Sequence, residues 1–196
     1  FALCEGSNSC HFLLHLFVDF DLNQTIHNMK KTVLVSGGAG FIGSHVTVEL
    51  IQSGYDVIIA DDFSNCDRTN YNGVCEITGR QLPLVEMDFC DIAAVRKLFI
   101  DNKIDAVIHF AAFKAVGESV SDPLKYYTNN LGSFLNVLQM ARKQGCNVLF
   151  SSSATVYGEP EELPVTENSP RQPATSAYGN TKQMCEDFLR DCVAAY

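Results

Sequence analysis

The sequence has no long run of lysine and arginine. Its 14 basic residues are outnumbered by 23 acidic residues, which gives a formal net charge of −9 at pH 7. A protein that binds nucleic acid or an anionic membrane through its surface charge needs basic side chains to meet the phosphates. The charge therefore argues against both kinds of partner, and it favours solubility.

The eight cysteines form no C-x-x-C pair and follow no regular spacing. Structural zinc sites and disulfide frameworks both require such patterns. The sequence therefore predicts no metal centre and no disulfide framework. Reduced thiols in a cytoplasmic protein fit the pattern better.

No apolar segment is long enough to span a bilayer at the N-terminal end, where residues 12–18 form a brief apolar patch broken by His15. The segment also lacks the basic start and the A-x-A-like cleavage site of a secretory signal. Met29, followed by two lysines, resembles a natural start. We expect residues 1–28 to be a disordered leader or upstream-translated extension, with a helix packed on the domain as the alternative, and residues 29–196 to form the domain.

The stretch VLVSGGAGFIGSH contains a glycine at every third position, namely Gly37, Gly40 and Gly43. A β-branched run at 32–35 precedes it, and apolar residues with helical spacing follow it as far as Gly54. Glycine either relieves a tight turn or lets a ligand approach the main chain. Since the unpaired N–H groups of the first helical turn attract phosphate, a pyrophosphate is the ligand to expect at this junction.

A second strand, 56–60, ends in Asp61 and Asp62, about twenty residues beyond the glycine turn. A dinucleotide-binding fold places a carboxylate there to accept hydrogen bonds from the adenosine ribose. Such an acid repels a 2′-phosphate, which favours NAD over NADP. The glycines are not followed by Lys and Ser or Thr, so a P-loop nucleotide hydrolase is not expected.

Strands and helices alternate along the rest of the chain, which predicts an α/β, Rossmann-like, doubly wound parallel sheet in the order 3-2-1-4-5. Further strands are expected at 82–87, 106–110 and 148–150, and helices at 92–102, 123–144 and 177–196. Residues 63–79 read as a polar loop with at most a poor helix. The polar clusters all follow strands, so they are expected to converge at the carboxyl edge of the sheet.

Tyr178 and Lys182 are four residues apart at the start of the last helix, which places both side chains on one face. Alone, such a pair is more often solvated surface, but here it follows a dinucleotide-binding half and a run of serines. A neighbouring ammonium and an oxidised nicotinamide would both lower the pKa of the phenol, so Tyr178 is a candidate general base. Ser153 follows strand five and is a candidate for binding the substrate oxygen, although a serine there also commonly caps a turn.

Six segments together carry a resemblance to a known family: VSGGAGFIGSH, DVIIADDFSN, VIHFAAFKAVGESV, YYTNNLGS, VLFSSSATVYG and AYGNTK. From about residue 31 to residue 196 the chain resembles the extended short-chain dehydrogenase/reductase family and, within it, the UDP-glucose 4-epimerases. Small departures from the family pattern include Ser36, Asp62 and Ala177.

The resemblance implies a role for each matching position. Ser153, Tyr178 and Lys182 would be catalytic, and His109 would be a packed core residue. The NAD-binding set would be Gly37, Gly40, Phe41, Ile42, Gly43, Asp61, Asp62, Asn65, Asp88, Phe89, Phe110, Ala111, Ala112, Lys114, Asn129, Ser151, Tyr178 and Lys182.

The implied reaction interconverts UDP-glucose and UDP-galactose by transient oxidation at sugar C4 and return of the hydride to the opposite face. The family also implies a homodimer built from helices 123–144 and 177–195, and a C-terminal domain that grips the UDP-sugar and is missing here. The alternatives are another NAD-dependent nucleotide-sugar epimerase or dehydratase, and a non-catalytic NAD-binding fragment. A dehydratase normally has an acid pair where this chain has Ala154 and Thr155.

Overall fold

A computed structural model describes residues 30–196, and the expectations for residues 1–28 lie outside the described part of the chain. Five parallel strands form one sheet in the order β3-β2-β1-β4-β5, as the sequence predicts. The strands are β1 (Thr32–Ser36), β2 (Asp56–Asp61), β3 (Leu84–Glu86), β4 (Ala106–His109) and β5 (Asn147–Phe150).

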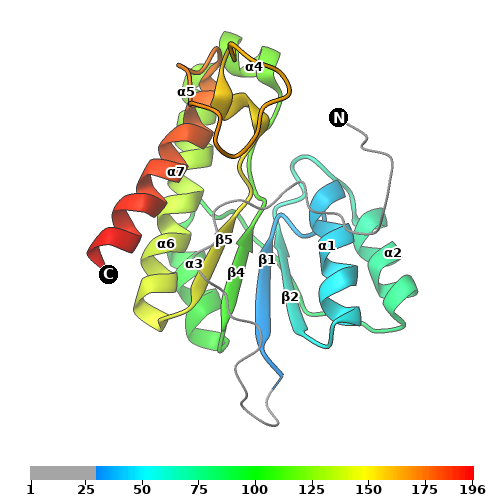
Figure 1. Ribbon diagram of the computed structural model, residues 1–196. Coiled ribbons are helices and arrows are strands. Elements are labelled where there is room, and N and C mark those ends of the chain that lie inside the picture. The colour runs from blue at the N-terminus through cyan, green and yellow to red at the C-terminus, as the bar shows by residue number, and fades with distance from the viewer. Residues whose placement is uncertain (1–29) are drawn as a thin grey trace.

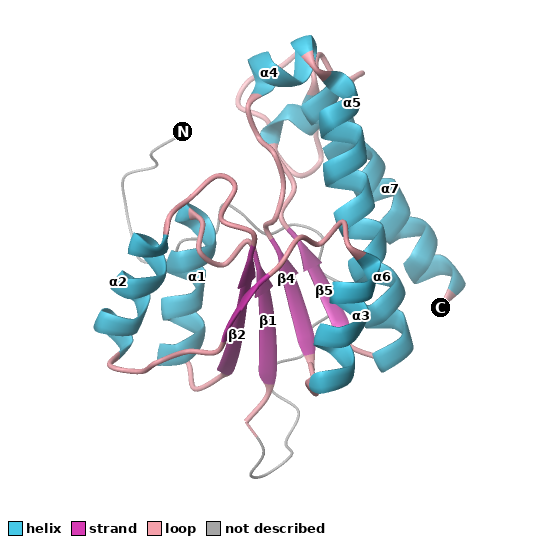
Figure 2. Cartoon of the chain, turned by 180° about the vertical axis from the view of Figure 1, so that it is seen from behind, coloured by secondary structure: helices cyan, strands magenta, loops and turns pink. Residues whose placement is uncertain are grey.

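Helices cover both faces of this sheet. Helices α1 (Phe41–Gln52) and α2 (Arg68–Thr78) lie on one side, while α3 (Ile92–Asp101), α6 (Gly132–Gln144) and α7 (Ala177–Ala195) lie on the other (Figure 1). The view from behind shows the same two layers, with α4 (Val116–Ser121) and α5 (Pro123–Tyr126) above the carboxyl ends of β4 and β5 (Figure 2). The short helices therefore stand beside the edge where the polar clusters were expected.

The alternation of side chains along β1 and β2 produces the two layers of the core. Leu34 and Ile58 pack with residues of α3 and α6, whereas Val33 and Ile59 pack with residues of α1 and α2. Because successive side chains of a strand point to opposite faces, a strand covered on both faces is apolar throughout. This is why β1 reads as an unbroken apolar run.

Capping residues set the helix boundaries. The side chain of Asp91 accepts hydrogen bonds from the first turn of α3, and Ser176 does the same for α7. Gly145 ends α6 in the left-handed conformation, at a φ of 71°.

The expectation of a mainly loop-like segment at 63–79 was wrong. Residues Arg68–Thr78 form the regular helix α2, with Asp67 as its N-cap and Gly79 as its left-handed C-cap. Tyr71 and Val74, three residues apart, are its buried side chains. An N-capping acid, a terminal glycine and this spacing were the available signals, and the polar composition obscured them.

The predicted helix at 123–144 is not one regular α-helix. It consists of α5, a π-helical segment at Tyr127–Leu131 and then α6. In a π-turn the hydrogen bonds reach one residue further, so an extra residue is accommodated without breaking the rod. Asn129 and Asn130 both lie in this segment.

Two smaller boundaries differ from expectation. Strand β3 is restricted to Leu84–Glu86, because Pro83 can offer no N–H to a neighbouring strand. The segment after β4, treated as a polar cluster, contains the short helix α4.

The structure predicts opposite effects for two glycine to alanine substitutions. In Gly43→Ala the added Cβ would lie 2.3 Å from the carbonyl oxygen of Gly37, so we expect a loss of about 1–3 kcal/mol in the free energy of unfolding. Gly73, inside α2, has no atom within 4 Å of such a Cβ, so Gly73→Ala is expected to add about 0.5–1 kcal/mol. Urea unfolding of both variants tests this, and equal effects would contradict the close contact at Gly43.

Candidate functional site

The glycine turn between β1 and α1 uses its glycines for different purposes. Gly37 has a φ of 72°, and a Cβ on it would lie 2.7 Å from the backbone nitrogen of Ala111. Gly43 lets α1 approach the carbonyl of Gly37. A Cβ on Gly40 would meet only that same carbonyl oxygen, at 3.2 Å. Two of the three glycines are therefore needed by the fold itself, and Gly40 is the one that leaves backbone open.

The N-terminus of α1 offers the features that an anion needs. Gly40 is its N-cap, and no side chain caps the first turn. The first turn contains Phe41, 71% exposed, and Ile42, 39% exposed. Uncapped N–H groups at the positive end of a helix bind phosphate, and two exposed apolar side chains beside them gain from being covered.

Asp61 lies at the predicted place, but its carboxylate already accepts hydrogen bonds from the protein backbone. It is only 7% exposed, and its two carboxylate oxygens accept hydrogen bonds from the backbone nitrogens of Ala39 and Phe63, each at 3.0 Å. Asp61 therefore ties the end of β2 to the glycine turn. Its Oδ1 also accepts from the thiol of Cys66 at 3.6 Å, so Oδ2 keeps a lone pair for a further donor.

Other predicted residues line a cavity of about 530 Å³ at the same edge. It brings together Asp62, Asp88 and Asn129, which come from three different connections of the sheet. Its other lining residues, which the sequence analysis did not single out, are Cys90, Phe113, Asp122, Leu124, Lys125 and Thr128. Asn65 is exposed on the loop after Asp62.

The remaining cofactor candidates divide between core and surface. Phe89 is only 3% exposed, and its side chain packs in the core beside α3 and α6. Its place beside the adenine stays a prediction. Phe110, Ala111 and Ala112 are half-buried in the segment that leaves β4, and Lys114 is exposed beyond them.

Asn130, which the sequence analysis missed, holds that segment in place. Its amide oxygen accepts from the backbone nitrogen of Phe113 at 2.9 Å, and its amide nitrogen donates to the carbonyl of Phe113 at 3.0 Å. The amide nitrogen also lies 3.2 Å from the hydroxyl oxygen of Thr181, on α7. Asn130 thus joins the β4 connection, the π-helical segment and α7, and the asparagine pair in YYTNNLGS was the only signal.

Tyr178, Lys182 and the serine run meet at the end of β5. The ammonium of Lys182 donates to the carbonyl oxygen of Ser151 at 2.7 Å and lies 5.9 Å from the centre of the Tyr178 ring. Ser153 caps a 3-10 helix at Ala154–Tyr157, accepts from the hydroxyl of Thr155 at 3.0 Å, and also hydrogen-bonds Tyr178. The capping function and the contact with the tyrosine therefore coexist in one hydroxyl.

Burial controls the charge states of this pair. It raises the pKa of Tyr178, and the hydrogen bond from Ser153 opposes the rise only in part. It also lowers the pKa of Lys182 to about 8. In the described residues the pKa of Tyr178 is therefore raised rather than lowered. An additional positive charge beside the ring would lower it.

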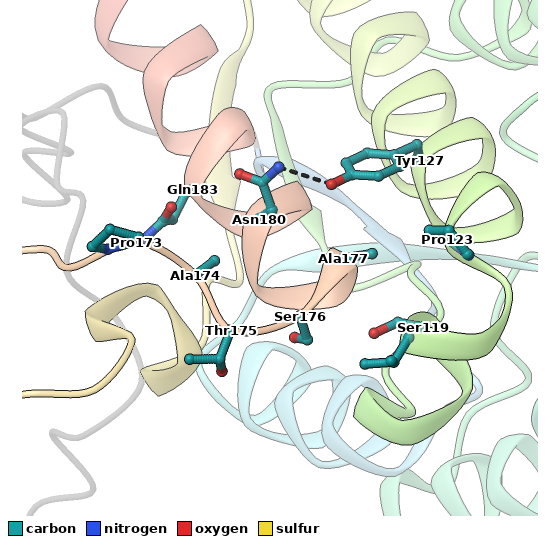
Figure 3. Close-up of a pocket in the computed structure, with 11 residues that line it drawn as sticks. Ser119, Pro123, Tyr127, Pro173, Ala174, Thr175, Ser176, Ala177, Asn180 and Gln183 are labelled. Carbon is teal, nitrogen blue, oxygen red and sulfur yellow. Dashed lines mark hydrogen bonds between the residues drawn. The ribbon is translucent and has the colours of Figure 1, made fainter.

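A second cavity, of about 580 Å³, lies on another side of α7 (Figure 3). Ala177, Asn180 and Gln183 face it from α7, and the amide of Asn180 donates to the hydroxyl of Tyr127 at 2.8 Å across it. None of the predicted site residues lines this cavity.

His109 is a packed core residue, as the sequence analysis expects. It is 1% exposed, its Nδ1 lies 2.7 Å from the hydroxyl oxygen of Ser36, and its ring contacts those of Phe134 and Phe150. Burial, with the charge of Lys182 adding to it, lowers its pKa to about 3. The imidazole of His109 is therefore neutral, and its Nε2 has no hydrogen-bond partner among the described residues.

His109 should make the protein sensitive to acid. Below pH 6.5 the unfolded chain binds a proton at this histidine and the folded chain does not, so stability is full above that pH and falls as pH drops toward 3. Between pH 7 and pH 5 this residue should account for a loss of about 2 kcal/mol. Urea unfolding of the double variant Ser36→Ala/His109→Leu, in which no hydroxyl is orphaned, should lack that part of the loss. His45→Ala, on the exposed face of α1, should retain it, and a double variant that also retains it would refute the explanation.

Known proteins resemble this chain over nearly the whole of its described part, in both sequence and fold. Residues 33–196 match the family described as "NAD dependent epimerase/dehydratase family". The UDP-glucose 4-epimerase of Caenorhabditis elegans is 50% identical over 169 residues, which is 81% of this chain and 48% of that protein. The enzyme of the same name from Bacillus subtilis is 52% identical over 160 residues, covering 81% of this chain and 47% of that protein.

Solved structures of UDP-glucose 4-epimerases have a similar fold. The UDP-glucose 4-epimerase of Bifidobacterium longum, in complex with NAD+ and UDP, has a TM-score of 0.82 and 47% identity, covering 84% of this chain and 50% of that one. The UDP-Glc/GlcNAc 4-epimerase of Campylobacter jejuni has a TM-score of 0.79 and 37% identity, with similar coverage. The chain therefore spans about half the length of the relatives it matches.

Proposed function

Because the chain belongs to the NAD dependent epimerase/dehydratase family, we propose that the whole protein is an NAD-dependent UDP-glucose 4-epimerase. The observation that carries the proposal is the meeting of an uncapped helix N-terminus, an acid-lined cavity, a half-buried tyrosine and a buried lysine at one edge of one sheet. The relatives named UDP-glucose 4-epimerase, at about half identity, support this substrate.

The residues present fit NAD at this edge. The bare first turn of α1, at Gly40, Phe41 and Ile42, would take the pyrophosphate. Asp61 and Asp62 would face the adenosine ribose, with Asn65, Asp88, Lys114, Asn129 and Ser151 around the cofactor. The carboxylates at the end of β2 favour NAD over NADP, because a 2′-phosphate would meet negative charge.

Gly37, Gly43, Phe110, Ala111 and Ala112 support this site through the backbone. Phe89, whose side chain packs in the core, would flank the adenine through its backbone.

The chain's own residues would move one proton. The phenol oxygen of Tyr178 would take it from the sugar 4-hydroxyl and later return it, with Ser153 holding the same substrate oxygen. Lys182 would bind the nicotinamide ribose and favour the phenolate. Bound NAD+ would supply the hydride acceptor, and its positive ring is the additional charge that the pKa of Tyr178 requires.

Elimination of water is the less favoured alternative. The positions after Ser153 are Ala154 and Thr155, in the 3-10 helix, and neither can act as the acid that would expel a hydroxide.

We also propose a homodimer and a cytoplasmic location. Helices α6 and α7 lie side by side (Figures 1 and 2) and leave Leu135 and Val193 exposed, which suits pairing with the same helices of a second copy. The six described cysteines are free thiols, which suits a reducing compartment. Among residues 30–196, no helix is both long and apolar enough to cross a bilayer.

The epimerase proposal is tested with the full-length protein that carries this chain, incubated with UDP-galactose and catalytic NAD+ while UDP-glucose is quantified. Tyr178→Phe should reduce turnover by at least about a hundredfold, because the general base is removed. Tyr55→Phe, at the amino end of β2, should leave turnover unchanged. Binding of NAD+ without conversion of the sugar would refute the substrate but leave the cofactor.

The cofactor proposal is tested on the 196-residue chain by calorimetric titration. NAD+ should bind more tightly than NADP+. Gly40→Val should weaken NAD+ binding at least about tenfold, because a branched side chain covers the first turn of α1. The melting temperature should also fall, because the Cβ would lie 3.2 Å from the carbonyl oxygen of Gly37 and valine is a poor N-cap, so affinities are compared at a temperature where both proteins are folded. Unchanged affinity in this variant would contradict pyrophosphate binding at α1.

A further inference from the structure

A buried carboxylate lies one helical turn beyond Lys182. Glu186 is 8% exposed, and both of its oxygens are engaged. One accepts from the hydroxyl of Ser152 at 2.5 Å, and the other lies 3.3 Å from a guanidinium nitrogen of Arg171. A carboxylate this buried is costly unless it is paired and hydrogen-bonded, so these two contacts account for its presence.

Through Ser152, Glu186 holds the end of β5. The residue before Ser152 is Ser151, whose carbonyl accepts from Lys182, and the residue after it is Ser153, which bonds Tyr178. The grip on the central serine therefore fixes the two neighbours that contact the tyrosine–lysine pair.

The titratable groups that face Lys182 come from two elements. On α7 they are Tyr178, Cys185 and Glu186, and on β4 there is His109, beyond the Phe150 ring over which the ammonium lies at 4.6 Å. His109 is neutral, and burial raises the pKa of the Cys185 thiol to about 12, so the thiol is neutral as well. Among these groups Glu186 supplies the negative charge, which opposes the loss of the lysine's proton on burial.

Arg171 modulates that charge from the other side. It reaches α7 from the connection between Gly158 and Ser176, and it binds Asp187 with both guanidinium nitrogens, at 2.9 and 3.2 Å. Its side chain is about one-third exposed, so it can be replaced without opening the core.

We propose that Glu186 is a positioning residue for Tyr178 and Lys182. Its carboxylate keeps Lys182 charged and clamps the serine run after β5, and Arg171 limits how much of its charge Lys182 experiences. This inference rests on the proposed function, since the charge of Lys182 matters there for binding the nicotinamide ribose.

The first test measures the ionisation of Lys182 directly, without cofactor. The chain is labelled with ¹³C at the lysine Cε, the signal is assigned by its absence in Lys182→Met, and its shift is followed from pH 6 to pH 11. Glu186→Gln keeps an oxygen for Ser152 but removes the charge, so the midpoint should fall by about one pH unit. Arg171→Met should move the midpoint the opposite way, because the carboxylate loses its other cation.

Asp187→Asn is the matched control. It removes one negative charge from the same helix and from the same arginine, yet Asp187 is not among the groups that shift the pKa of Lys182. Its midpoint should therefore stay at the parent value. The proposal would be overturned if the Lys182 midpoint fell equally in Asp187→Asn and Glu186→Gln. It would also be overturned if the midpoint did not move in Glu186→Gln, or did not move in Arg171→Met. If Glu186→Gln does not fold, Glu186→Asp takes its place, because the shorter side chain withdraws the charge from Lys182 and Ser152, and its midpoint should also fall.

The second test separates this inference from the proposed function. NADH affinity is measured by fluorescence across the same pH range, and the pH at which affinity falls should follow the Lys182 midpoint in each variant. Failure of the parent chain to bind NADH would refute the proposed cofactor, while the lysine titration would still decide the role of Glu186. Binding whose pH profile ignores the shifted midpoint would overturn the proposed link to the cofactor.

Discussion

Contact between bare backbones at the end of β1 is the constraint on which the rest of this edge depends. Gly37 lies against the backbone of Ala111, and α1 approaches Gly37 at Gly43, so the first turn, the first helix and the exit of β4 meet with no side chain between them. Asp61 then reaches across from β2 to the nitrogen of Ala39. Three connections of the sheet are thereby drawn to one place, and the cavity lined by Asp62 and Asp88 lies at the same edge.

The same edge places titratable groups where water is scarce. Without a ligand, burial holds Tyr178 in its neutral form and brings the pKa of Lys182 down to about 8. Without a ligand, Tyr178 is thus not the phenolate that a general base requires. A ligand that brings positive charge to the ring would lower the pKa of Tyr178, which relates cofactor binding to proton transfer.

Much of this arrangement could be predicted from the sequence, and the exceptions have physical reasons. The strand order follows from apolar runs joined by crossovers, and the convergence of Asp62 and Asp88 follows from parallel strands having a common carboxyl edge. Asn129, in the π-helical segment, came only from the family resemblance. The π-helical segment was not predictable, because its hydrogen-bond pattern has no separate periodicity. Asn130 and Glu186 were missed because their importance lies in partners 17 and 34 residues away, at Phe113 and Ser152. For Asp61 the position was right, but the backbone donors that it serves are visible only in three dimensions.

The π-helical segment also constrains the length of the chain. Asn129 lines the cavity, while Asn130, the next residue and its hydrogen-bond partner at 3.0 Å, is buried against Phe113 and Thr181, so the two neighbours serve different contacts. Removing one residue between Tyr127 and Leu131 would restore the regular α-helical hydrogen bonds, and the helices on either side would keep their faces, because the π-turn is what accommodates the extra residue. One of the two adjacent asparagines would then be lost from its position. The cavity wall at Asn129 and the buried contacts of Asn130 can therefore both be kept only with the present number of residues.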